Sequence, residues 1–456
     1  MNRSNRFRLL FVICSFFIVV ALFWRLLPHM PDSQGVGMTY DAVKTYAICI
    51  ESGHVTNWHS SLFMYECIAL KHVAALVFGR EFSGTGILWG VWISTTIVMA
   101  AAICLLAYTM LKKGSWWAVA LPCCIAVSFK YVGDLSPVGL DYYFVCLLWC
   151  LFAAMFMHFQ AGQSMFRVFY LVLIFVLLLH LVSYRKNFAL SVPFVLGWLF
   201  YTMNWFRELK WKKKFAVWLT LTFAFISFSM IWVDTLLPVK KQHPITPMME
   251  SDVRIAAVLR GERDLYRLNG FRKSEGKPEE TCISAYWFRL PESRWKEALD
   301  VYVDEWKQNT ETMCAAAIIQ RIQFYSGGYS FPFLKAAVES RFPAVRRNEN
   351  AWKTIAPTVQ SPLKRLFWLC MAPICVALGF VCRWREIVSP EICAAVIIAG
   401  SLSTLYSLSY LLVTPTSDAR YLAPSYMFAL FAVSVIVCAI LEMLCKGVFT
   451  RLREKS

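Results

Sequence analysis

The sequence has few charged residues and lacks the repeats that define several common protein classes. Only 16% of its 456 residues are charged, whereas 58% are hydrophobic, and the mean hydropathy is +0.51. No heptad pattern, low-complexity tract or internal repeat is present, which argues against a coiled coil, a solenoid and an obviously repeat-built transporter. A soluble globule of this length is not so apolar, so a lipid bilayer must be the solvent for much of the chain.

Metal-binding spacings are also missing. The sixteen cysteines include no Cys-x-x-Cys and no paired His/Cys spacing suited to zinc, so we expect no structural metal site. Most of them lie in apolar runs, where a thiol behaves as a small apolar group. Only Cys49, Cys67, Cys282 and Cys314 are expected outside the membrane, and either disulfides among them or free thiols fit the sequence.

Long apolar runs are what the sequence has in abundance. A membrane-spanning helix needs about 20 mostly apolar residues; four runs meet this length and six shorter or weaker runs join them. The ten predicted spans cover residues 9–27, 87–111, 116–133, 138–160, 166–184, 188–204, 215–237, 365–382, 389–413 and 426–444. The first follows three arginines but has no small-residue cleavage site, which indicates an uncleaved signal anchor.

The basic residues predict the orientation of these spans. The formal net charge is +17, but lysine and arginine gather at span ends, where they act as topology signals rather than as nucleic-acid contacts. Residues 61–78 carry Glu66, Lys71 and His72 in an apolar pattern, so we expect an interfacial helix that does not cross. Both termini and the basic cluster at 207–214 then lie in the cytoplasm.

This orientation divides the chain into three parts. An N-terminal membrane domain covers residues 1–238 and contains the first external loop at 28–86; an external segment follows at 239–363, and C-terminal membrane helices cover 364–456. Helical patterns in the external segment, at 251–263, 293–307 and 310–323, favour a helical cap. The predicted fold class is an all-α polytopic membrane protein of about ten transmembrane helices, with juxtamembrane helices in the first external loop and a mostly helical external segment.

Three polar residues at predicted external positions are ambiguous. Asp41 follows the first span at the start of a helical stretch, where it is either a helix-capping acid or a general base at the membrane surface. His59, after Trp58, is either a satisfied polar group or a substrate contact. Asp141 begins a span, as a polar cap or as a substrate-binding acid.

Two external turns carry cations against the positive-inside preference. Arg185, Lys186 and Asn187 lie between two spans, and Arg420 and Tyr421 come shortly before the last span. A cation at a span end can reach toward lipid headgroups without any further role. Because these cations are predicted on the translocated side, an anionic ligand explains them equally well.

The order of these loops resembles the GT-C glycosyltransferases, the multispanning family that includes protein O-mannosyltransferases and lipid A aminoarabinose transferases. Asp41 matches the acid of that family's first external loop. His59-Ser60-Ser61-Leu62 matches its His-Pro-Pro-Leu-like motif, with serine in place of both prolines. Arg185-Lys186-Asn187 resembles an Arg-x-Asn of bacterial relatives, and Arg420-Tyr421 resembles an Arg-Tyr motif.

The resemblance implies an inverting transfer of a sugar from a polyprenyl-phosphate-linked donor to a glycan, lipid or protein acceptor. The reaction would take place on the extracytoplasmic face of a bacterial plasma membrane, in the synthesis of a cell-envelope glycan. A metal ion is not required in principle, because protein cations can neutralise the single phosphate; no cofactor is assigned, and a divalent cation, which one branch of the fold uses, stays open. A lipid-carrier flippase or transporter and a noncatalytic assembly subunit of the same fold remain as alternatives.

The resemblance also implies roles for the polar residues. Asp41 would be the catalytic base that takes the proton of the acceptor. The donor phosphate would bind three cations, Arg185, Lys186 and Arg420. The candidate substrate contacts are His59, Asp141, Asn187 and Tyr421.

Overall fold

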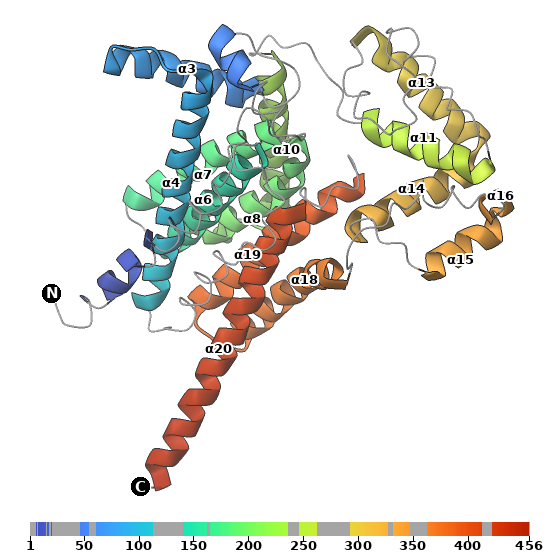
Figure 1. The fold of residues 1–456 in the computed structure, drawn as a ribbon. Helices are drawn as coiled ribbons and strands as arrows, with labels where there is room; N and C mark the ends of the chain where they lie inside the picture. Colours follow the sequence, from blue (N-terminus) through green and yellow to red (C-terminus); the bar gives the residue numbers. More distant parts are fainter. Residues whose placement is uncertain are drawn as a thin grey trace. The chain divides into compact units, whose positions relative to one another are not determined.

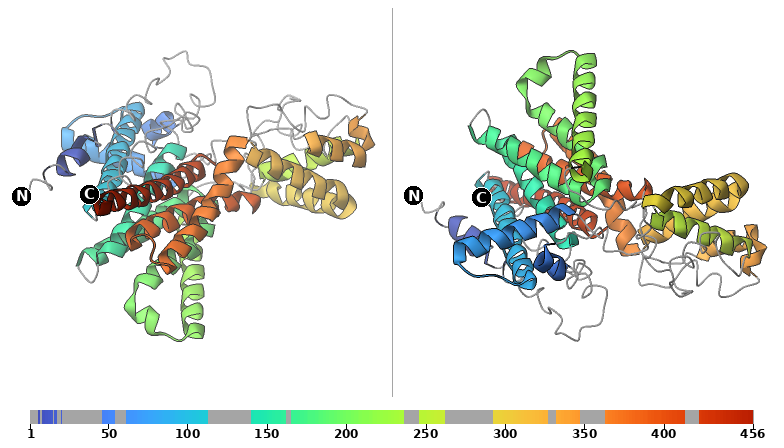
Figure 2. Two further views of the ribbon diagram at one scale, coloured as in Figure 1. Left: turned by 90° about the horizontal axis from the view of Figure 1, so that it is seen from below. Right: turned by 90° about the horizontal axis from the view of Figure 1, so that it is seen from above.

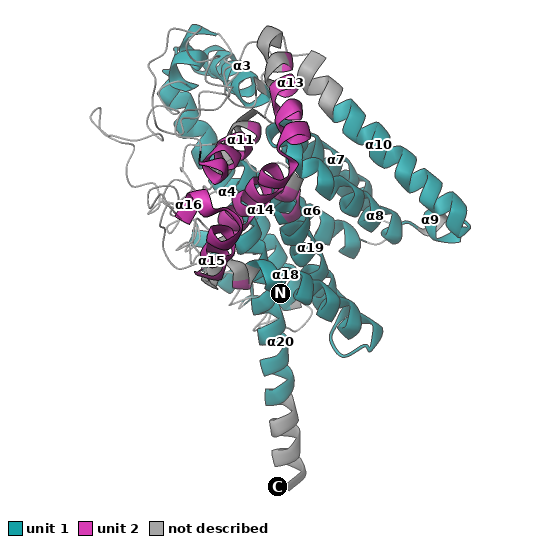
Figure 3. Cartoon of the chain, turned by 90° about the vertical axis from the view of Figure 1, so that its right-hand side faces the viewer, with its two compact units in different colours: residues 1–238, 368–407, 420–456 teal, residues 239–367, 408–419 magenta. Residues whose placement is uncertain are grey.

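The computed structural model describes residues 6, 8–14, 16–17, 20, 46–53, 61–112, 140–161, 165–235, 246–261, 292–326, 332–346, 363–412 and 422–455. Within these ranges the regular elements are helices and there is no strand. The chain divides into two compact units, coloured separately in Figure 3. Unit 1 consists of residues 1–238, 368–407 and 420–456, and unit 2 of residues 239–367 and 408–419.

Five helices in the described part of the chain are long and apolar enough to cross a membrane (Figure 1). They are α4 (Gly84–Lys112), α6 (Leu140–Gln160), α7 (Met165–Tyr184), α19 (Pro390–Leu412) and α20 (Ala423–Lys455). Each contains an apolar stretch of at least 18 residues, close to the roughly 20 that the hydrocarbon core of a bilayer demands. The prediction of an all-α membrane protein therefore holds, and five of the ten expected spans coincide with candidate membrane helices.

The other expected spans are matched by described helices only in part. Helices α10 (Trp211–Thr235) and α18 (Leu363–Trp384) coincide with two of them, and α18 contains a shorter apolar helix, Leu369–Trp384. The expected span at 116–133 and most of the one at 9–27 lie outside the described residues. Helix α3 (Ser61–Phe78), which we expected at the membrane surface, is not among the five candidate spans.

The expected span at 188–204 is not one continuous α-helix. It consists of the 3₁₀ helix η2 (Lys186–Ser191) and the α-helix α8 (Val192–Thr202). Pro193 lies in the first turn of α8, where its missing N–H and fixed φ favour the start of a new helix. The eleven residues of α8 extend about 16 Å, roughly half the thickness of a bilayer core.

Aromatic packing joins α6 to α20 in the core of unit 1. Trp149 stacks on Phe428 with ring centroids 4.6 Å apart, and Phe152 meets Phe431 at 5.2 Å. All four side chains are buried. Each such pair contributes about 0.5–1.5 kcal/mol beyond the burial of its area, so this cluster fixes the pairing of the two helices.

Small residues let α18 and α19 approach closely. A Cβ atom added to Gly400 would lie 2.7 Å from Val376 Cγ2 and 3.0 Å from the carbonyl oxygen of Ala372. One added to Gly379 would lie 2.8 Å from Ile397 Cγ1. Glycine at these two positions lets the helix backbones come into contact, which is how many membrane helices associate.

Unit 2 contains a separate set of amphipathic helices. They are α11 (Thr246–Arg260), α13 (Glu292–Gln308), α14 (Thr310–Ser326), α15 (Pro332–Arg341) and α16 (Pro343–Arg346). The first three coincide with the predicted helices of the external segment, and α11 packs against both α13 and α14 (Figure 2). Their shared core is apolar: Met249, Val253, Ile255, Ala256, Leu259, Met313, Ala316, Ile319, Leu334, Val338 and Val345.

Candidate functional site

The predicted cation motif lies at the end of α7. The backbone of Arg185 is extended, with φ −137° and ψ 94°, and its N–H still donates to the carbonyl of Leu181 at 2.9 Å. Lys186 then begins η2 with an exposed side chain, whereas Arg185 and Asn187 are partly buried. The motif therefore presents cations at the junction between α7 and η2.

Phe188, the residue after this motif, anchors it in unit 1. Its fully buried ring lies 5.6 Å from the ring of Phe144 at the start of α6 and 6.3 Å from that of Tyr406 in α19. Phe144 and Tyr406 stack at 5.2 Å. The start of α6, the end of α7 and the last third of α19 therefore meet at one end of unit 1, as expected if all three face the same side of the membrane.

A polar network that the sequence did not predict lies beside this motif. His180 Nε2 is 2.7 Å from Glu66 Oε1, so α7 and α3 are joined by a histidine–carboxylate pair. The hydroxyl of Tyr184, one turn after His180, donates to the other oxygen of Glu66. The rings of Tyr184 and Tyr143 meet edge to face, with centroids 5.1 Å apart. We call Glu66, His180, Tyr184 and Tyr143 the Glu66 network.

The Glu66 network is walled by aromatic rings but remains accessible. Phe63 of α3 lies 5.1 Å from the ring of Tyr143 and 6.0 Å from that of Tyr184. Of the pair itself, 33% of the Glu66 side chain and 26% of the His180 side chain are exposed. The carboxylate and imidazole are therefore partly exposed, beside a cluster of aromatic rings.

Cys67, next to Glu66, is an unreactive thiol. It is fully buried, and burial, followed by the nearby Glu66, raises the pKa of its thiol to about 12. At neutral pH it is therefore protonated and is neither a nucleophile nor a metal ligand. Cys49 and Cys314 are free thiols as well, and Cys282 lies outside the described residues.

The other predicted site residues are not placed by the structure. Asp141 is the second residue of α6, where the helix N-terminus favours an acid, but its side chain is not described. Asp41, His59 and the Arg420-Tyr421 pair lie outside the described residues. Their proposed roles stay predictions. Within the part of the chain that is described, no three His, Cys, Asp or Glu residues are grouped so that they could hold a metal ion.

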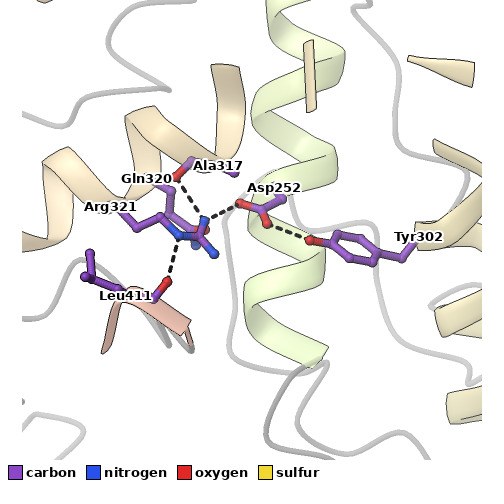
Figure 4. A network of polar contacts seen from close by, with 6 residues as sticks. All are labelled: Asp252, Tyr302, Ala317, Gln320, Arg321 and Leu411. Atoms are coloured by element: carbon purple, nitrogen blue, oxygen red, sulfur yellow. Dashed lines mark hydrogen bonds and ion pairs between the residues drawn. The ribbon is translucent and has the colours of Figure 1, made fainter. Parts of the chain in front are cut away.

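Unit 2 has a buried polar network of its own (Figure 4). Asp252 of α11 has no exposed surface; its Oδ1 lies 3.4 Å from Arg321 Nη1, and its Oδ2 accepts a 2.9 Å hydrogen bond from Tyr302. Arg321 Nε also donates to the carbonyl of Leu411 at 3.1 Å, in the last turn of α19. Because a helix end leaves carbonyls unpaired, Arg321 caps α19 while it balances Asp252. This network ties four helices together and is structural in character.

The sequence did contain a signal for the Glu66 network. Glu66 is an acid within the apolar stretch of α3, and His180 is a histidine near the end of a predicted span. An ionisable residue within an apolar helix of a membrane protein is usually paired and often functional. Tyr184 follows His180 by four residues, on the same helix face. The partners could not be matched from the sequence, because Glu66 and Tyr184 are 118 residues apart.

Comparison of the chain with protein-family models, with curated proteins and with solved structures found no match.

Proposed function

We propose that the protein is a membrane glycosyltransferase that takes its sugar from a polyprenyl-phosphate-linked donor, with the donor phosphate bound by Arg185 and Lys186. One observation carries the proposal: these two cations directly follow the helix turn that contributes His180 and Tyr184 to the Glu66 network. Cations for a phosphate, an acid–base pair and aromatic rings are therefore gathered at one end of the same membrane unit.

The chemistry of the reaction suits these groups. The acceptor hydroxyl oxygen attacks the anomeric carbon, the bond between that carbon and the phosphate oxygen breaks, and the electron pair leaves with the lipid phosphate. The guanidinium of Arg185 can bind two phosphate oxygens at once, and Lys186 adds a point charge. Fixed cations at the leaving phosphate stabilise the charge that develops there. Asp41 takes the acceptor proton in this scheme, as the resemblance to the GT-C family implies.

Transfer assays in proteoliposomes test the proposal. A panel of radiolabelled polyprenyl-phosphate sugars is offered to the native protein, to Asp41→Asn and to Arg185→Gln. Lys213→Gln at the start of α10 is the control, because it also removes one positive charge, from an exposed side chain. We expect transfer by the native protein and the control. Asp41→Asn should transfer sugar about 100-fold more slowly or worse, because a general base usually accelerates a reaction by that factor. Full activity in Arg185→Gln, or no transfer from any donor, would contradict the proposal.

A second candidate function is transport of a lipid-linked substrate across the bilayer. The specific observation that favours it is the Glu66–His180 pair itself, since paired ionisable groups in membrane helices also mark proton and substrate pathways. In the same proteoliposomes, a labelled lipid that changes leaflet without any sugar transfer would support this function. Its movement should then depend on a pH difference across the membrane.

A further inference from the structure

A basic surface lies in unit 1 where the short helix α9 (Asn204–Glu208) connects α8 to α10 (Figure 3). Residues 207–214 contain five cations and a single carboxylate, Glu208. Four of the five cationic side chains are exposed and the fifth, that of Lys214, is partly buried. A positive charge of this density next to membrane helices favours an anionic partner.

Hydrogen bonds hold three of these cations together. Lys214 Nζ donates to the carbonyl of Arg207 at 2.7 Å, and the backbone N–H of Lys214 donates to the carbonyl of Lys210 at 2.9 Å. An ammonium group has three N–H donors, so two of those on Lys214 can still meet a ligand. At about 100° per residue, Lys210, Trp211 and Lys214 share one side of α10. Lys212 and Lys213 lie more than about 100° around the helix from the middle of that side.

A strip of aromatic rings continues along α10 from these cations. The ring of Trp211, which is 76% exposed, lies 6.4 Å from that of Phe215, and Phe215 lies 5.7 Å from Trp218. Trp218 is fixed in turn by its Nε1, which donates to the carbonyl of Pro193 in α8 at 2.8 Å. Exposed tryptophan beside lysine is typical of the boundary between lipid headgroups and acyl chains. Beyond it, α10 exposes a series of large apolar side chains: Phe215, Leu219, Leu221, Phe223 and Phe228.

This surface lies far from the cations proposed to bind the sugar donor. Arg167, near the start of α7, donates from Nη2 to the carbonyl of Thr202 at the end of α8. His158 of α6 joins the same two residues, with its ring nitrogens 3.1 Å from the Arg167 carbonyl and from Thr202 Oγ1. The basic surface is therefore at the first end of α7, whereas Arg185 follows the other end. The 20 residues of α7 separate the two ends by about 30 Å.

We infer that Arg207, Lys210 and Lys214 bind the phosphate of an anionic phospholipid, whose acyl chains lie over Trp211 and Phe215. A guanidinium can bind two phosphate oxygens and the ammonium groups add point charges. Cations followed by an exposed apolar strip match a phospholipid, with its anionic head and apolar chains, better than they match a soluble anion. The inference is independent of the proposed sugar transfer. Lysines that serve only as topology signals would act through their number and not through the side of α10 on which they lie.

Photo-crosslinking in proteoliposomes tests which cations matter. The full chain is reconstituted in phosphatidylcholine with a trace of phosphatidylglycerol that carries a photoactivatable acyl chain, well below saturation, and labelled peptides are identified by mass spectrometry. Labelling of residues 207–218 should fall about 30-fold in Lys210→Gln/Lys214→Gln, since each lysine near an anionic lipid is worth roughly a factor of five. Lys212→Gln/Lys213→Gln removes the same charge and should lose less than about threefold. Equal losses in the two variants, or no loss in the first, would overturn the inference.

Two further comparisons separate lipid binding from a folding defect and from other occupants. Lys210→Arg/Lys214→Arg keeps both charges and should be labelled like the native protein; a loss as large as that of the Gln pair would refute phosphate binding by charge. Unlabelled phosphatidylglycerol should displace the probe, whereas inorganic phosphate or a soluble acidic peptide at the same concentration should not. Displacement by either soluble anion would show that the occupant is not a phospholipid.

Discussion

Replacement of Asp252 by Asn should remove a pH dependence of stability that one buried carboxyl imposes on unit 2. Burial raises the pKa of Asp252 from 3.8 to about 6, although Arg321 and Tyr302 both act in the opposite direction. A shift of one pKa unit corresponds to 1.36 kcal/mol, so the difference of roughly two units is worth about 3 kcal/mol. The isosteric amide of Asn resembles the protonated acid at every pH.

The sign follows from proton binding. Between the unfolded pKa of 3.8 and the folded pKa of about 6, the folded protein binds more protons at Asp252 than the unfolded chain does. Stability therefore falls as the pH rises through this window and is constant above it. The full contribution of about 3 kcal/mol is present at pH 3.8 and below, and it is lost by about pH 6 to 7.

Hydrogen exchange of the full chain in detergent micelles can measure this effect. Protection factors of peptides from α11 and α14, corrected for intrinsic exchange, should fall about 150-fold between pH 4 and pH 7 in the native protein. They should be nearly constant in Asp252→Asn. Asp304→Asn, which removes a half-exposed carboxyl of α13, is the matched control and should behave like the native protein. A slope that survives in Asp252→Asn, or protection that rises with pH in the native protein, would refute the reasoning.

Two further predictions concern packing and thiol reactivity. Gly400→Leu should lower the thermal unfolding midpoint, because overpacking costs about 1–3 kcal/mol. Gly90→Leu is the control and should leave the midpoint unchanged, because a Cβ at Gly90 meets nothing within 4 Å. Equal midpoints in the two variants would disprove the close contact of α18 and α19. Maleimide at pH 7.5 should modify the exposed Cys314 and leave the buried Cys67 unmodified, as detected by mass spectrometry. Rapid labelling of Cys67 in the folded protein would contradict its burial.

Local sequence patterns predicted much of the helical structure. The helices expected at 251–263, 293–307 and 310–323 overlap α11, α13 and α14, because each repeats apolar residues at helical spacing. At 188–204 the hydropathy of the segment predicted one continuous span, because average hydropathy depends on composition and does not detect a break in the helix. Pro193 was visible in the sequence as a helix-start signal and would have indicated the division into η2 and α8.

The candidate site was predictable only in part. Arg185 and Lys186 could be proposed from their position alone, since the expected topology puts them on the translocated side, against the positive-inside preference. The pairing of Glu66 with His180 could not, because it depends on how α3 packs on α7, and no local pattern encodes that contact. Asp41 and Arg420 remain predictions from the resemblance, outside the described residues.

Photo-crosslinking tests most directly whether Arg185 and Lys186 hold the phosphate of a lipid-linked substrate, as proposed. A benzophenone-bearing polyprenyl phosphate is irradiated with the protein in proteoliposomes, and the modified peptides are identified by mass spectrometry. We predict labelling at the junction of α7 and η2 that falls about tenfold or more when both residues are changed to Gln, since charge-assisted contacts are worth about 1.5–3 kcal/mol. The corresponding double change at Lys212 and Lys213 should leave it intact. Labelling that persists unchanged without Arg185 and Lys186 would contradict the account.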